Sequence, residues 1–142
     1  MSTIIDGTNG ISSAGYVNAT TSMTATTSVT ATTTVSDAIG NVRVLPTNAQ
    51  SSSYTLVLSD AGKLIDTTSG GVTVPSGIFS AGQTISIYND SSSTITITQG
   101  TSVTMYLVGT ASTGNRSLTQ RGVATVICVG SNTFVITGGG LS

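Results

Sequence analysis

The residues of this chain that could do chemistry are few, and most of the usual catalytic types are missing. The sequence holds one cysteine, five aspartates and four basic residues, but no histidine and no glutamate. Without histidine there is no imidazole to activate a nucleophile or to bind a metal ion. The five aspartates are dispersed and form no evident pair for acid–base catalysis. We therefore predict a protein that is not an enzyme and that uses no cofactor and no metal.

Two features that could be mistaken for reactive sites are better explained by structure. Cys128 lies in the apolar run Val123–Val129 with no group to activate its thiol, so we expect a buried structural cysteine. The glycines 138–140 have the composition of a phosphate-binding loop. No helix follows them, so we expect a flexible C-terminal end instead.

The charged side chains also favour a structural interpretation. Asp60 and Asp66 flank Lys63, which we interpret as a surface charge cluster where a turn enters a strand. Arg116 and Arg121 flank a polar segment and could bind a carboxylate or the backbone carbonyls of a partner. Solvated arginines are the simpler expectation for both.

A six-residue repeat organises the first forty residues. Three hexads that begin at Ala19, Ala25 and Ala31 are nearly identical. Because six is a multiple of two, residues six apart share one face of an extended chain, whereas a helix would scatter them. One face is thinly apolar, and the other carries only hydroxyl groups over residues 20–36. The apolar positions form the candidate arm interface: Ile5, Ile11, Val17, Met23, Val29 and Val35.

So thin an apolar stripe needs copies of itself, or another surface, to pack against. We expect the chain to associate with copies of itself, most simply as a homotrimer. The small alanines of the hexads would let three arms approach closely. A β-helical coil within one chain is the competing interpretation of the same hexads. The sequence leaves both open.

Composition excludes several classes of partner. Only 6% of the residues are charged, against about 25% in an ordinary soluble domain. The net charge of −1 gives no electrostatic footprint for nucleic acid. No apolar run is long enough to span a membrane. The first residues show no secretory signal, and a single cysteine suits synthesis in a reducing cytoplasm.

We predict an all-β chain with three parts: an extended Ser/Thr-rich arm over residues 1–40, a connection over 41–53, and a small antiparallel β-sandwich or barrel over 54–142. Short apolar runs alternate with turn signals from Tyr54 onward, and helix-forming residues are scarce. Val123–Val129 is apolar on both faces, which favours a central strand. The other expected strands are Tyr54–Leu58, Lys63–Thr67, Val72–Val74, Thr84–Asn89, Thr94–Thr98, Ser102–Val108 and Thr133–Thr137.

An ordered set of short motifs runs through residues 54–142. It comprises Asp60-Ala-Gly-Lys63, Gly70-Gly-Val-Thr-Val-Pro75, Phe79-Ser-Ala-Gly82, Ile85-Ser-Ile-Tyr-Asn89, Thr96-Ile-Thr-Gln-Gly100 and Arg121-Gly-Val-Ala-Thr-Val-Ile-Cys-Val129. Val103, Asn132-Thr-Phe-Val-Ile136 and Gly138 complete it. In this order the motifs resemble a β-domain of bacteriophage tail fibres and other virion structural proteins.

The resemblance implies a virion structural protein that is β-rich, often trimeric and without catalytic residues. The implied partners are copies of itself and other virion proteins, such as the major capsid protein. The chain is short for a tail fibre, so a capsid decoration (cement) protein or capsid fibre anchored by its arm is our first expectation. A short tail fibre, or a tip that binds a host receptor or glycan, is the alternative.

The first testable prediction concerns the arm. An isolated peptide of residues 1–40 should give the circular dichroism spectrum of a disordered chain, because its apolar face is too thin to bury itself. A strong β signal from a peptide that sedimentation shows to be monomeric would contradict this.

Overall fold

The structure is a computed structural model that describes Ser36 and residues 44–142, and the structural statements below concern these residues. The candidate arm interface lies outside the described residues and stays a prediction; it comprises Ile5, Ile11, Val17, Met23, Val29 and Val35.

The described part of the chain is all-β, as the sequence predicts. Its one departure from strands and turns is a short 3-10 helix, η1 (Leu58–Asp60). The strands are β1 (Thr47–Gln50), β2 (Tyr54–Thr55), β3 (Leu64–Thr67), β4 (Val72–Val74), β5 (Thr84–Asn89), β6 (Ile95–Gln99), β7 (Thr104–Leu107), β8 (Arg116–Gly130) and β9 (Thr133–Leu141).

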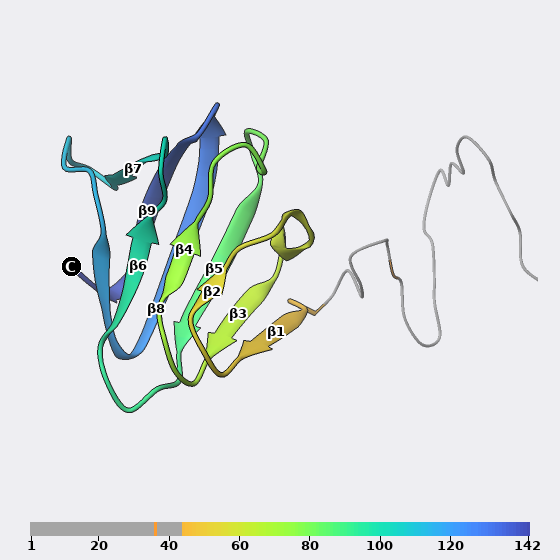
Figure 1. Cartoon of the computed structure of the whole chain (residues 1–142), viewed down its shortest axis with the longest axis vertical. Helices are drawn as coiled ribbons and strands as arrows, with labels where there is room; N and C mark the ends of the chain where they lie inside the picture. The colour runs from red at the N-terminus through yellow and green to blue at the C-terminus, as the bar shows by residue number, and fades with distance from the viewer. Residues whose placement is uncertain (1–35, 37–43) are drawn as a thin grey trace, which may run out of the picture. The chain divides into compact units, whose positions relative to one another are not determined.

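The first six strands wind as three successive coils. β1, β3 and β5 are neighbours in one row, and β2, β4 and β6 are neighbours in a second row. Within each row the strands are parallel. The chain alternates between the rows, so each pair of strands, β1–β2, β3–β4 and β5–β6, makes one coil (Figure 1).

The expected antiparallel pairing is therefore wrong for these six strands, whereas the expected all-β domain with a barrel-like sheet is confirmed. Each connection crosses to the other row before the chain returns, so a strand comes back in the same direction as its neighbour. Between the strands that the structure describes, antiparallel pairing involves β8 in every case, because β8 pairs with β5, β6 and β9. The residue pattern could not reveal this, because side chains alternate with a period of two in both kinds of sheet.

Strand β8 joins the two rows into one nearly closed sheet. Its second half pairs with β5, from Val123 opposite Tyr88 to Ile127 opposite Thr84. Its first half pairs with β6, where Leu118 lies opposite Ile95. The pairing of β8 with β9 shifts register between Leu118 and Val123. β8 thus passes from one row to the other at this irregularity.

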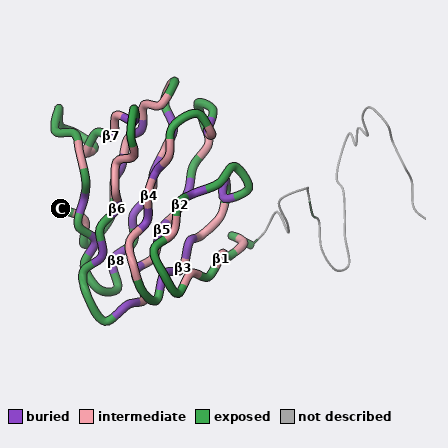
Figure 2. Tube along the Cα trace, in the orientation of Figure 1, coloured by how far each residue is buried: buried purple, intermediate pink, exposed green. Residues whose placement is uncertain are grey.

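The core fills the space enclosed by the sheet. Along β5 and β8, buried and more exposed residues alternate, which Figure 2 shows as a change of colour from residue to residue. Cys128 is fully buried, as the sequence predicts. Phe79 packs edge-on against Phe134 with ring centroids 6.2 Å apart. The largest fully buried side chains are Phe134, Leu56, Ile65, Ile85, Ile87, Ile97, Met105, Leu118, Ile136, Val72, Val74 and Val126.

Two segments that the sequence left irregular belong to the sheet. β1 lies inside the expected connection over 41–53. The expected flexible end at Gly138–Gly140 is wrong, because Gly138 and Gly139 pair with Ala124 and Val123. A Cβ at Gly138 would collide with the backbone of β8. The glycine run therefore allows close approach between strands rather than mobility.

The turns of successive coils stack closely, and this gives a prediction about two glycines. Gly70 and Gly62 both have left-handed backbones, with φ of +79° and +77°. A Cβ at Gly70 would lie 2.6 Å from the carbonyl carbon of Ser52 in the preceding coil, whereas a Cβ at Gly62 meets nothing within 4 Å.

We expect Gly62→Ala to lower the free energy of unfolding by about 1–2 kcal/mol, through backbone strain alone. Gly70→Ala should lower it clearly further, because the two turns must also separate. Urea denaturation of both variants measures the difference. Equal losses would show that the turns at Ser52 and Gly70 are not in contact.

Candidate functional site

The first coil leaves an open strand edge. Among the residues that the structure describes, β1 and β2 stand at the two ends of the strand order, so each has a single strand neighbour there. The carbonyl of Pro46 accepts from Leu64 N (2.9 Å) and that of Gln50 accepts from Thr68 N (2.8 Å). Because backbone groups alternate in direction along a strand, those of Thr47 and Ala49 point away from β3. Both residues are exposed.

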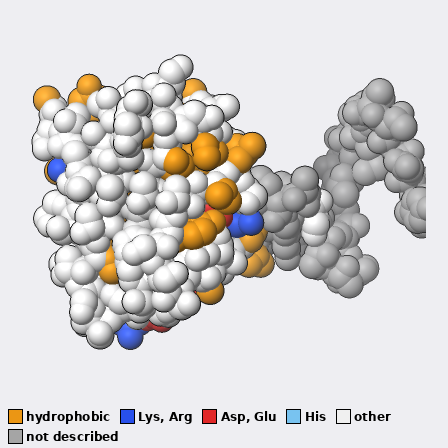
Figure 3. Space-filling view, in the orientation of Figure 1, with side chains coloured by type: hydrophobic (Ala, Val, Ile, Leu, Met, Phe, Trp, Pro, Cys, Tyr) orange, Lys and Arg blue, Asp and Glu red, His pale blue; other side chains and the backbone are white. Residues whose placement is uncertain are grey.

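A group of apolar side chains lies beside this edge. Val44, Leu45, Val57 and Leu58 are 59%, 49%, 43% and 56% exposed. They make up half of the eight large hydrophobic side chains that are exposed in the described part of the chain. Val44 and Leu45 lead into β1, and Val57 and Leu58 follow β2, so both pairs occur at the same end of the first coil. Figure 3 shows hydrophobic side chains gathered on this side of the domain.

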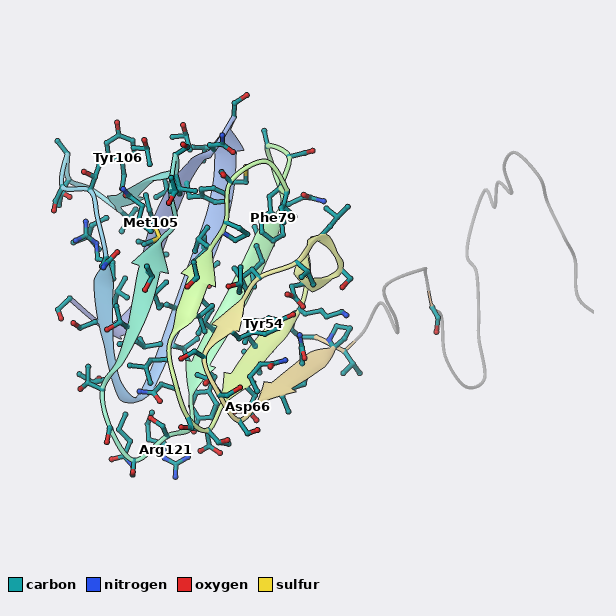
Figure 4. All side chains as sticks on the ribbon, viewed as in Figure 1. Tyr54, Asp66, Phe79, Met105, Tyr106 and Arg121 are labelled. Atoms are coloured by element: carbon teal, nitrogen blue, oxygen red, sulfur yellow. The ribbon has the colours of Figure 1, made fainter. Side chains whose placement is uncertain are left out.

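The interior of the first coil combines the fully buried Leu56 with a polar network around Asp60. Asp60 is fully buried and accepts three hydrogen bonds. Its donors are Asn48 Nδ2 (2.8 Å), the Tyr54 hydroxyl (2.9 Å) and the Val57 backbone N–H (2.9 Å). Gln50 Nε2 extends this network by donating to Asn48 Oδ1 (2.7 Å). In Figure 4, Tyr54 lies beside β1 and β3, where the network forms.

This network corrects the expected surface charge cluster. Asp60 is not a surface residue, because three donors satisfy its carboxylate inside the coil. The sequence pattern does not reveal the burial of Asp60, because Asn48 lies in the expected connection and Tyr54 is an isolated aromatic residue. The turn itself is confirmed: η1 ends at Asp60 and β3 begins at Leu64.

The two expected surface arginines differ from one another. The Arg121 side chain is 63% exposed and forms an ion pair with Asp90. It also donates to the Tyr88 hydroxyl (2.9 Å). Arg116 is only 9% exposed, so the expectation of a solvated side chain is wrong for it. Its guanidinium donates to the carbonyl of Ser112 (2.7 Å).

The outer face of β2, β4 and β6 carries rows of hydroxyl groups. Thr55, Thr73 and Thr98 lie opposite one another on the three strands. A hollow of about 480 Å³ opens over this face. No charged or aromatic side chain contributes to it. Its lining is Ser53, Thr68, Ser69, Gly70, Gly71, Thr73, Ser91, Ser92, Ser93, Thr94, Ile95, Thr96 and Thr98.

Membrane-spanning helices and clusters of metal ligands are both absent from the part of the chain that the structure describes. The described residues contain no helix that is long and apolar enough to cross a membrane. Within residues 44–142 and Ser36, no three potential metal ligands of the His, Cys, Asp or Glu types lie together. Comparison of the chain with protein-family models, curated proteins and solved structures found no match. A function for the candidate site therefore has to be inferred from the geometry and chemistry of its residues.

The hydrogen-bond network around Asp60 leads to a prediction about the free energy of unfolding at alkaline pH. Burial, together with the hydrogen bond to the carboxylate of Asp60, raises the pKa of Tyr54 above the ordinary tyrosine value. The folded state thus holds the phenol proton more tightly than the unfolded chain does. This contribution to stability is fully present below the unfolded pKa of about 10 and is lost as pH rises through the folded pKa.

We expect Tyr54→Phe to lose about 1–2 kcal/mol of stability at pH 7, because the Asp60 carboxylate loses a donor. Above about pH 10 its stability should fall less steeply than that of the wild type. Denaturation at a series of pH values measures both effects. Tyr106→Phe, which removes a hydroxyl outside this network, is the matched control for the stability change at pH 7. A wild-type slope in Tyr54→Phe would contradict the network.

Proposed function

We propose that this chain is a non-enzymatic structural protein of a bacteriophage particle. It acts as an oligomer, a trimer being the simplest stoichiometry, and serves as a capsid decoration protein or a capsid fibre. The arm anchors it to the major capsid protein or to other virion proteins. It is made in the host cytoplasm and functions in the virion.

The observation that carries this proposal is the nearly uncharged, hydroxyl-rich surface of the β-domain. Six charged residues occur in residues 44–142, and two of them, Asp60 and Arg116, are buried. The threonine row on β2, β4 and β6 offers hydrogen bonds worth about 0.5–1.5 kcal/mol each. Such weak contacts become strong when many copies are held together. A surface of this kind suits a subunit packed among neighbours better than a free monomer.

The sequence resemblance to virion β-domains over residues 54–142 supports the same proposal. The resemblance indicates that the assembly would be a bacteriophage particle, whereas the surface chemistry indicates only a protein packed among neighbours. The all-β architecture agrees with the resemblance but is common to many other classes of protein.

The hollow over β4 and β6 favours a second candidate function, a short tail fibre or a tip that binds a host glycan. Hydroxyl and backbone groups along its wall could exchange hydrogen bonds with sugar hydroxyls. No aromatic side chain of the lining offers a surface on which a sugar ring could stack. The first function is therefore better supported.

The proposed function can be tested by measuring the copy number of the protein in purified bacteriophage particles and the stability of particles that lack it. Quantitative mass spectrometry should find this protein at a copy number comparable with that of the major capsid protein. Particles that lack it should lose infectivity sooner on heating or osmotic shock, because its many weak contacts no longer hold the shell. Adsorption to host cells should be unchanged. A low copy number with poor adsorption would favour the tail fibre, and absence from the particle would contradict both functions.

A further inference from the structure

We propose that the open end of the first coil is a self-association surface, where β1 pairs with β1 of a second copy across a two-fold axis. This inference rests on the described edge and does not require the proposed function. It adds a two-fold contact to any association through the arm.

The backbone of β1 is complementary to itself. Thr47 and Ala49 each direct one N–H and one C=O away from β3. When two such edges meet antiparallel, Thr47 of one copy lies opposite Ala49 of the other, and each of these pairs exchanges two hydrogen bonds. Asn48 then lies at the two-fold axis. The contact satisfies all four outward groups of each strand.

Within residues 44–142, the edge of β1 also lacks the features that normally protect an exposed strand. Proteins prevent edge pairing with charged side chains, prolines, bulges or a covering loop. β1 reads Thr-Asn-Ala-Gln, with its one nearby proline at position 46 before the strand begins. The contrast is β7, which also has one strand neighbour, β9. Its other side is covered, because Leu107 N donates to Ser112 O (2.9 Å) and Tyr106 bridges to Thr113.

The side chains around the edge favour a second copy over a charged partner. No charged residue occurs in residues 44–59, and the nearest carboxylate, Asp60, is buried and fully paired. The paired segment 47–49 therefore brings no charge of its own to the contact, and the nearest basic residues, Arg43 and Lys63, lie before the start of β1 and of β3. The apolar group formed by Val44, Leu45, Val57 and Leu58 flanks the edge and would be covered in the same contact.

A cysteine experiment on the full chain tests the register. Full-length Thr47→Cys and Ala49→Cys chains are mixed and oxidised. The proposed pairing puts these two positions about 5.5 Å apart between Cα atoms, within the range that a disulfide spans. Positions 47 and 47, or 49 and 49, lie diagonally and farther apart. The mixture should give clearly more disulfide-linked dimer than either variant alone. Equal yields from all three samples would overturn the register.

A matched pair of charge substitutions tests the surface. Leu45 and Val108 are similarly exposed, at 49% and 51%, but only Leu45 lies beside the open edge. Sedimentation should show that Leu45→Lys weakens the two-fold association by at least about tenfold, because a lysine is desolvated in the contact. Val108→Lys should leave it unchanged. Circular dichroism of each variant verifies its fold.

Hydrogen exchange distinguishes whether a second copy of the chain or something else covers the edge of β1. The amides of Thr47 and Ala49 should be protected at high protein concentration and should exchange rapidly on dilution to the monomer. Protection that persists in a monomer would overturn the proposal, because something other than a second copy then covers the edge. Rapid exchange at every concentration, with equal sedimentation of Leu45→Lys and Val108→Lys, would overturn it as well.

Discussion

The pairing of β8 with both rows of strands is the constraint on which the rest of this structure depends. Among strands β1–β6 a side-chain hydrogen bond joins Asn48 of β1 to Tyr54 of β2, but the two rows share no backbone hydrogen bonds of the sheet. β8 supplies them, with Val123–Ile127 along β5 and Arg116–Leu118 along β6. The two halves are joined at Arg121, whose φ of 62° is left-handed, and at Gly122, where a side chain would collide with Leu118.

The two ends of the coiled region differ because only one of them is closed in this way. At the β8 end, apolar side chains such as Val126 and Ile87 fill the interior. At the first coil the interior is completed by the polar network around Asp60. A buried network whose hydrogen bonds are satisfied fixes one arrangement of side chains. The first coil can therefore end the domain while its strand edge remains available for pairing.

Some of the fold could be predicted from the sequence, because it depends on local patterns. Strands Val72–Val74 and Thr84–Asn89 follow from alternating apolar residues between turn signals, and the burial of Cys128 follows from its apolar run. The parallel pairing could not be predicted, since it depends on where each connection crosses. The sequence pattern does not reveal β1, because its inward-facing side chains, Asn48 and Gln50, are polar. The amide of Asn48 finds its hydrogen-bond partner outside the strand, at Asp60.

The candidate site likewise divides into features that local sequence patterns predict and features that depend on contacts between distant residues. The turn at Asp60 is visible in the sequence, but its burial depends on Asn48 and Tyr54, which precede it by several residues and come from two different strands. The open edge is a property of strand order, which no residue pattern encodes. The hydroxyl-rich surface, in contrast, follows directly from composition, and it is the feature that carries the proposed function.

Native-state hydrogen exchange tests most directly whether β8 unites the two rows. If it does, the amides of β5, β6 and β8 share one opening free energy, equal to that of global unfolding, because neither row can open without breaking the pairing with β8. The contradicting result would be a β6 row that opens at a clearly lower free energy while β5 and β8 stay protected. The rows would then be separate units, and β8 would not be the element that holds the domain together.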